Sequence, residues 1–100
     1  MVDYRTRGDT ATVLLSGELD HSAAAAVKRS LDEIIADRKI KNLVLDLKNL
    51  TFMDSAGLGV IMGRYRQLAG RSGQMAVKNV SSSIDRIFSI SGIYSIVRKL

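Results

Sequence analysis

The stretch that decides the fold is NLVLDLKNLTFMDSAGLGVIMGRYR, residues 42–66. Its first part, Asn42 to Leu47, is an almost continuous apolar run of the length expected for a central strand covered on both faces. After Met53 the apolar period changes to that of a helix that starts near Asp54 or Ser55. One stripe of this helix is predicted to lie in the core, and it carries Leu58, Ile61, Met62, Tyr65 and Leu68.

Two strands and a helix are predicted on the N-terminal side of this stretch. Residues 10–19, TATVLLSGEL, are typical of a buried strand, and a turn at Gly8 and Asp9 would join it to a shorter edge strand over residues 3–7. A helix is expected from His21 to about Arg38, with Asp20 as its N-cap. Its buried stripe carries Val27, Leu31, Ile34 and Ile35.

Another strand and a third helix are predicted on the C-terminal side. Two glycines, Gly70 and Gly73, bracket the end of the second helix, and residues 74–80 form the next strand. Ser82 with Asp85 resembles a capping box that opens a third helix, which Gly92 would stop. This helix carries Ile84, Ile87 and Phe88, and residues 93–100 are expected to form a final short strand. Strands that alternate with single helices predict an α/β domain.

Composition indicates one globular domain. The chain has 100 residues, 46% of them hydrophobic and 25% charged, and no cysteine, so disulfides and cysteine-based zinc sites are excluded and no metal site is expected. It also lacks an apolar stretch long enough to cross a bilayer, and we expect a cytoplasmic protein. The net charge of +5 would favour acidic partners or nucleic acid, but the basic residues are scattered apart from the cluster of Arg38, Lys39 and Lys41.

The turn before the second helix is the candidate functional segment. Its sequence, FMDSAGLGV at residues 52–60, is rich in small residues and has a carboxylate and a hydroxyl at its tip. A phosphate-cradling loop would need the lysine of a P-loop, which is missing. A nucleophilic role for Ser55 would need a base, and the chain has one histidine, His21, and no G-x-S-x-G motif. The remaining interpretation is a site for protein docking and phosphorylation, so no enzyme activity, catalytic residue or cofactor is expected.

Two segments resemble a known family. The words GELDH at residues 17–21 and FMDSAGLGVIMGRYR at residues 52–66 are similar to anti-sigma factor antagonists of bacterial sporulation and stress signalling, within the STAS superfamily. The resemblance implies a mixed sheet with helices packed on one side. It covers the whole chain, and Ser91-Gly92 also fits. The family has a further C-terminal helix, and we expect residues 1–100 to be a single STAS domain without it.

The resemblance also implies a mechanism of transcription regulation. In such a family the unmodified protein docks on an anti-sigma factor that is also an ATP-dependent serine kinase, and so frees the sigma factor. The kinase then phosphorylates the second serine of an Asp-Ser-Ser-Gly loop, and a metal-dependent serine phosphatase resets it. Asp54, Ser55 and Gly57 match this loop, and Ala56 stands at the phosphoserine position. Ala56 is either natural, or a substitution that traps the binding form; the fit of the flanking residues favours the second. Ser55 is the fallback acceptor and is expected to cap the helix.

The partner-binding loops implied by the resemblance consist of Asp20, His21, Asp54, Ser55, Ala56, Gly57 and Leu58. Asp20 could instead only cap the first helix, and the histidine is more typical of an exposed loop side chain than of a ligand. Arg64 and Arg66 are expected on the solvated face of the second helix. The alternatives are a STAS module of a stress-signalling scaffold or a transporter-associated complex, and a small basic nucleic-acid binder. We expect no partner that is a nucleic acid or a membrane.

Overall fold

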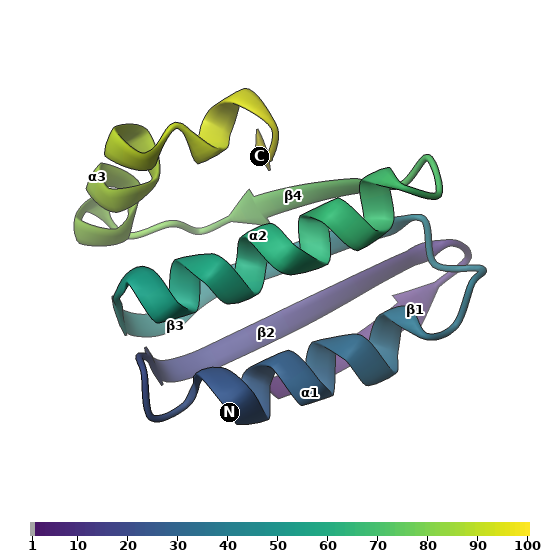
Figure 1. Ribbon diagram of the computed structural model, residues 1–100, viewed down its shortest axis with the longest axis horizontal. Coiled ribbons are helices and arrows are strands. Elements are labelled where there is room, and N and C mark those ends of the chain that lie inside the picture. The colour runs from purple at the N-terminus through teal and green to yellow at the C-terminus, as the bar shows by residue number, and fades with distance from the viewer. Residues whose placement is uncertain (1) are drawn as a thin grey trace.

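Five strands form one mixed sheet in the order β1-β2-β3-β4-β5 (Figure 1). The structure, a computed structural model, describes residues 2–100. The strands are β1 (Val2–Arg7), β2 (Thr10–Leu19), β3 (Asn42–Met53), β4 (Gln74–Lys78) and β5 (Arg98–Lys99). The β1–β2 pair is antiparallel and the other three pairs are parallel. The prediction that residues 42–47 lie in the middle of the sheet is confirmed.

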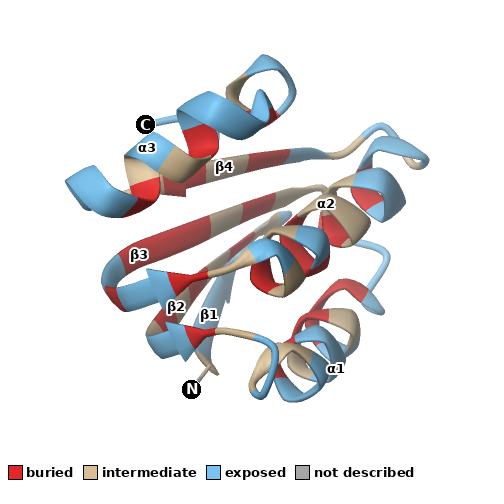
Figure 2. Cartoon of the chain, turned by 60° about the vertical axis from the view of Figure 1, so that its left-hand side comes forward, coloured by how far each residue is buried: buried red, intermediate tan, exposed pale blue. Residues whose placement is uncertain are grey.

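Three α-helices cover one face of this sheet. They are α1 (Ala24–Ile35), α2 (Ser55–Ala69) and α3 (Ser82–Ser91), and a short 3-10 helix, η1 (Ile93–Ser95), follows them. Alternate strand residues such as Val13, Leu45 and Val77 are buried beneath the helices, whereas most residues between them are partly exposed, with Asp46 buried as an exception. Figure 2 shows α1 and α2 side by side on the same side of the sheet. Within residues 2–100 no helix is long and apolar enough to cross a membrane.

The strands β2 and β3 extend beyond the rest of the sheet. The pairing of β1 with β2 stops at Leu15, and that of β4 with β3 stops at Asp46. Beyond these points residues 16–19 of β2 pair with residues 49–53 of β3, with two irregularities of register. We call this part the ribbon. The predicted end of β3 at Leu47 was wrong because exposed polar residues and a bulge interrupt the apolar run while the pairing continues.

The first helix is shorter than predicted. It begins at Ala24, because residues 21–23 form a separate turn. The Asp20 carboxylate accepts a hydrogen bond from the Ala23 N–H at 3.0 Å and so closes this turn, and the N-cap position itself is occupied by Ala23. The helix ends at Ile35 rather than near Arg38. The prediction of Asp20 as the N-cap was therefore wrong, although this side chain stabilises the chain just ahead of the helix.

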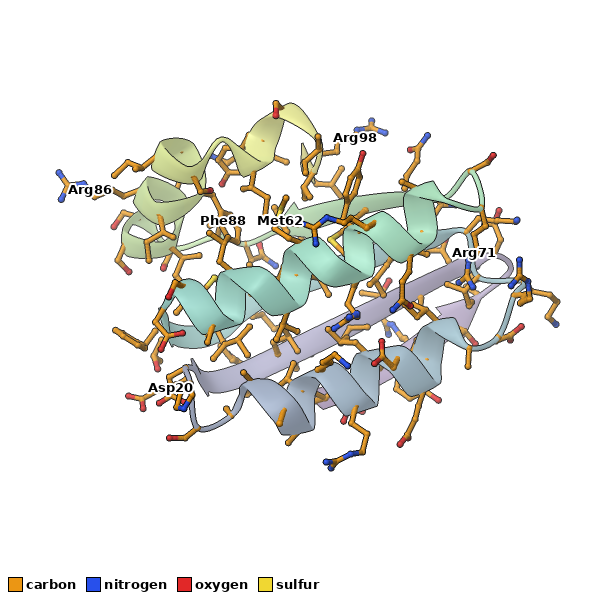
Figure 3. The ribbon with its side chains drawn as sticks, viewed as in Figure 1. Asp20, Met62, Arg71, Arg86, Phe88 and Arg98 are labelled. Atoms are coloured by element: carbon orange, nitrogen blue, oxygen red, sulfur yellow. The ribbon has the colours of Figure 1, made fainter. Side chains whose placement is uncertain are left out.

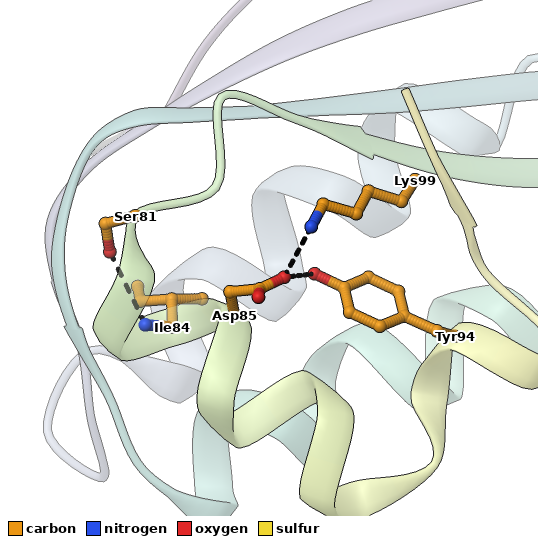
Figure 4. A network of polar contacts seen from close by, with 5 residues as sticks. All are labelled: Ser81, Ile84, Asp85, Tyr94 and Lys99. Atoms are coloured by element: carbon orange, nitrogen blue, oxygen red, sulfur yellow. Dashed lines mark hydrogen bonds and ion pairs between the residues drawn. The ribbon is translucent and has the colours of Figure 1, made fainter.

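The third helix is capped one residue earlier than predicted. Ser81, not Ser82, is the N-cap, and its hydroxyl accepts a hydrogen bond from the Ile84 N–H. Asp85 lies outside the capping box and accepts hydrogen bonds from Tyr94 at 2.6 Å and Lys99 at 2.8 Å (Figure 4). These bonds hold the C-terminal segment on α3. The strand predicted over residues 93–100 is confirmed only at Arg98–Lys99, because residues 93–95 form η1.

Candidate functional site

Two loops lie side by side at the outer end of the ribbon. Because β2 and β3 are parallel and Leu19 is the register neighbour of Met53, the residues that follow them leave the sheet at the same level. Residues 20–23 lead into α1, and Asp54 leads directly into α2. The labelled Asp20 marks this end of the molecule in Figure 3. We call these two loops the tip.

Asp54 connects the two loops. It is the N-cap of α2, with extended backbone angles, and its Oδ1 accepts a hydrogen bond from the Gly57 N–H at 3.1 Å. Its Oδ2 accepts a second one, from the His21 N–H at 2.9 Å. The bond from Gly57 is the main cause that lowers the pKa of this carboxyl, and the amides of His21 and Ala56 add to it against some desolvation. The charged carboxylate therefore both caps α2 and binds the loop in front of α1.

Ser55 and Ala56 form the first turn of α2. The expectation that Ser55 caps the helix was wrong, because Asp54 takes that position. Ser55 is exposed, and within the part of the chain that the structure describes its hydroxyl forms no hydrogen bond. Ala56 is partly exposed and offers only a methyl group. The Ser55 hydroxyl is therefore free and lies beside the N-terminus of α2.

Gly57 and Leu58 connect the tip to the core. Gly57 is buried, and a Cβ at this position would overlap the carbonyl oxygen of Leu19 and lie 2.8 Å from the Leu19 Cγ. The glycine therefore allows α2 to approach β2 closely. Leu58 is partly buried and packs against the core, and its N–H donates to the Asp54 carbonyl at 3.0 Å.

His21 is exposed, as expected for a loop histidine. Its backbone N–H, rather than its ring, makes the contact with the second loop. Asp20 is partly buried and its carboxylate remains in its own turn. Among residues 2–100 no group of three or more His, Asp or Glu side chains is placed to hold a metal ion. The two loops of the tip are thus joined through backbone N–H groups and the carboxylate of Asp54, while Asp20 closes only its own turn.

The two arginines of α2 differ in their exposure to solvent. Arg66 is exposed as predicted, whereas Arg64 is 5% exposed, so the prediction of a solvated position was wrong for it. The reason is that α1 packs along this side of α2. The Arg64 Nε lies 3.0 Å from Asp32 Oδ1, and Lys28 approaches the same carboxylate at 3.5 Å. The sequence did not indicate this pair, because its members lie on different helices and each is also compatible with a solvated face.

Comparisons with known proteins agree with this architecture. The STAS domain family matches residues 1–100. An anti-sigma F factor antagonist of Paenibacillus polymyxa is 47% identical over 85 residues, which make up 85% of this chain and 73% of that protein. The Bacillus cell fate determinant SpoIIAA in its phosphorylated form has a TM-score of 0.78 and 26% identity, over 100% of this chain and 91% of that one. SpoIIAA has also been solved unphosphorylated, with a TM-score of 0.75 and 26% identity over 90% of this chain and 83% of that one.

A likeness in fold alone extends to an anti-sigma factor antagonist from Mycobacterium paratuberculosis. Its TM-score is 0.87 at 23% identity, over 99% of this chain and 83% of that one. The five-stranded mixed sheet, the three helices on one face and the match over the whole sequence lead to one assignment. This chain belongs to the STAS domain family.

Proposed function

We propose that this chain is a cytoplasmic anti-sigma factor antagonist whose tip docks on an anti-sigma factor and thereby releases a sigma factor. The observation that carries the proposal is the pairing of two exposed loops through Asp54, beside a free serine hydroxyl. Relatives from Paenibacillus polymyxa and Bacillus subtilis bear the names of such antagonists. The small residues of the tip support close approach of a protein partner.

The proposed switch is phosphorylation by an anti-sigma factor that is also a serine kinase using ATP, with a metal-dependent phosphatase for the reverse step. We place the acceptor at Ser55, because Ala56 has no hydroxyl to modify and Ser55 is exposed and unbonded. That SpoIIAA has been solved in phosphorylated and unphosphorylated forms supports a switch of this kind.

A phosphate on Ser55 would act locally. It would add about 1.5 to 2 negative charges on the residue next to Asp54, near the backbone amides that already lower the pKa of that carboxyl. The free N–H groups at the start of α2 could stabilise this charge in water, but a closely fitting partner would have to desolvate it. Docking would therefore be lost without refolding of the chain.

The experiment combines intact mass and affinity. The chain and its Ser55→Ala and Ala56→Ser variants are incubated with the anti-sigma F factor of Paenibacillus polymyxa and ATP, with the antagonist of that organism as positive control. We expect the chain and Ala56→Ser to gain one phosphate and Ser55→Ala to gain none. If Ser55→Ala is still modified, the acceptor is another residue.

The docking role is tested separately by affinity. Without ATP, the chain and Ser55→Ala should bind the anti-sigma factor equally well, and Ser55→Asp should bind weakly. Asp54→Ala should clearly weaken docking on the anti-sigma factor but lower the melting temperature only slightly, because Asp54 is not part of the hydrophobic core. If the chain itself does not bind while the positive control does, the proposed function is wrong.

A further inference from the structure

Phe52 is a large apolar side chain left exposed on the ribbon. It is 48% exposed and lies two residues before Asp54. Its register neighbour on β2 is Glu18, which is exposed as well. The residues that follow them, Met53 and Leu19, are buried under the helices, so alternation along the strands places Phe52 and Glu18 on the opposite, helix-free face. In Figure 2 the strands β2 and β3 each show an exposed stretch just before a buried end.

The position of Phe52 separates it from the other exposed apolar side chains. Within residues 2–100 the other large ones are Tyr4 on β1, Ile90 on α3, and Ile96 and Leu100 in the C-terminal segment. None of these four belongs to the two strands that carry the tip. Phe52 is therefore the exposed large apolar group that is continuous in the chain with the proposed docking loops.

The surroundings of Phe52 make it prominent. The exposed residues near the tip include small ones such as Gly17, Ser22, Ser55 and Gly59, which leave room for the backbone of a partner to come close. Aromatic side chains that enter a pocket of the partner, surrounded by contacts of low energy, supply most of the affinity in many protein interfaces. An exposed aromatic side chain two residues before a loop followed by small residues fits this arrangement.

We propose that Phe52 is the apolar anchor of this chain and inserts into an apolar pocket on the anti-sigma factor when the tip docks. The inference rests on the proposed function and extends it, because it adds the helix-free face of the ribbon to the docking surface. The anti-sigma factor should accordingly contact both the loop tips and the end of β3. Glu18, beside the ring, would lie at the rim of the contact.

The test compares two exposed aromatic residues. The affinity and the dissociation rate are measured for the anti-sigma F factor of Paenibacillus polymyxa with the chain and with its Phe52→Ala, Phe52→Leu and Tyr4→Ala variants. Tyr4 is the matched control, since it is aromatic, 53% exposed and away from the tip. The melting temperature of each variant is recorded, and the two alanine variants should lower it to a similar, small extent because both residues are about half exposed.

We expect Phe52→Ala to weaken binding by about tenfold or more, mainly through faster dissociation, with Phe52→Leu intermediate and Tyr4→Ala within about twofold of the chain. Binding of Phe52→Ala at the affinity of the chain would overturn the anchor and leave the proposed function intact. An equal loss in Tyr4→Ala would overturn it too. If the chain itself fails to bind while the Paenibacillus antagonist binds, both proposals are wrong.

Discussion

The two ends of the molecule are held together in different ways. At the end opposite the tip, which we call the base, the connections β1–β2, α1–β3 and α2–β4 meet. The Lys41 N–H donates to the Asp9 carbonyl at 2.8 Å, and the Gln74 N–H donates to the Lys41 carbonyl at 2.7 Å. The Lys41 Nζ also donates to the Arg71 carbonyl at 3.1 Å, and Arg71 in turn donates to the Ile40 carbonyl at 2.9 Å (Figure 3). In all four bonds the acceptor is a backbone carbonyl.

At the tip the bond that joins the two loops depends instead on one ionisable side chain. The Asp54 carboxylate accepts the bonds that join its two loops, and Ser55 lies next to it in the chain. A charge added or removed there should change the contacts of the tip, whereas the four carbonyl acceptors of the base carry no charge; the Asp9 carboxylate at the base also accepts a bond from Asn42 at 3.2 Å. The comparison teaches that, within one sheet, one end is held by bonds to backbone carbonyls and the other joins its two loops through a charged side chain.

The largest losses of stability are expected when one glycine at each end of the molecule is replaced by alanine. A Cβ at Gly57 would overlap the Leu19 carbonyl, and a Cβ at Gly73 would lie 2.6 Å from the Lys41 carbonyl and 2.9 Å from that of Leu68. Since backbone has to shift in both cases, Gly57→Ala and Gly73→Ala should each lower the free energy of unfolding by about 1 to 3 kcal/mol. Only Gly57→Ala should also weaken docking. Thermal unfolding and affinity together measure both effects.

Gly59→Ala is the control for this pair. Gly59 is exposed on α2, and a Cβ there would meet nothing within 4 Å. An alanine in a helix should stabilise the chain by about 0.5 to 1 kcal/mol relative to glycine. If Gly57→Ala unfolds at the same temperature as Gly59→Ala, the distance between α2 and β2 does leave room for a Cβ at position 57. The steric explanation for Gly57 would then be wrong.

An effect of similar size is expected from the ion pair between α1 and α2. Asp32→Ala should destabilise the chain by about 1 to 3 kcal/mol, because it leaves the guanidinium of Arg64 buried without a carboxylate. Arg64→Met should cost less, since an apolar side chain of similar length can replace a buried charge whose Nη1 has no hydrogen-bond partner in residues 2–100. Denaturant unfolding of both variants measures the difference. A larger loss in Arg64→Met would show that the arginine has a further role.

The sequence predicted the features that depend on local periodicity. The central position of β3, the start of α2 and the stop at Gly92 follow from apolar spacing and from the left-handed backbone that glycine adopts, with φ of 79° at Gly92. The two loops of the tip could be found because each lies in a motif that is continuous in the chain, GELDH at residues 17–21 and FMDSAG at residues 52–57.

Features that depend on pairs distant in the chain could not be predicted. Arg64 is buried against α1, where it forms an ion pair with Asp32. Strand β3 continues past Leu47 because its exposed residues still pair with the backbone of β2. The same limit applies to the two hydrogen bonds that the Asp54 carboxylate accepts. Its hydrogen bond to Gly57 is local and can be expected of an N-cap, whereas its bond to His21 spans 33 residues and exists only once the two strands are parallel neighbours.

A still smaller effect is expected at the base. Lys41→Met removes the bond from Nζ to the Arg71 carbonyl and should cost about 0.5 to 1.5 kcal/mol, because the backbone bonds of the same loops remain. Docking should not change. The matched change at the tip is Asp54→Asn, which keeps an acceptor but removes the charge and should weaken docking. If Lys41→Met weakened docking as much as Asp54→Asn, the division between a stable base and a regulated tip would be wrong.

The smallest effect is a local response to pH. The folded chain lowers the pKa of Asp54 below its ordinary value of 3.8, so the contribution of this carboxylate is complete above that value and is lost as the pH falls through the folded pKa. The amide resonances of His21 and Gly57 should therefore move in acid with a midpoint below 3.8, while that of Gln74, bound to a carbonyl at the base, should not follow them.

Nuclear magnetic resonance spectra recorded from pH 6 downwards measure this response. Asp54→Asn is the control, because it should abolish the shared titration of the two amides while the amide of Gln74 behaves as before. Asp46 and Asp85 also have lowered pKa values, so the overall stability in acid reports all three carboxyls at once, and only the amides isolate the tip. A midpoint for His21 and Gly57 at or above 3.8 would mean that the carboxylate does not bind the two loops, and the tip would then need another link between them.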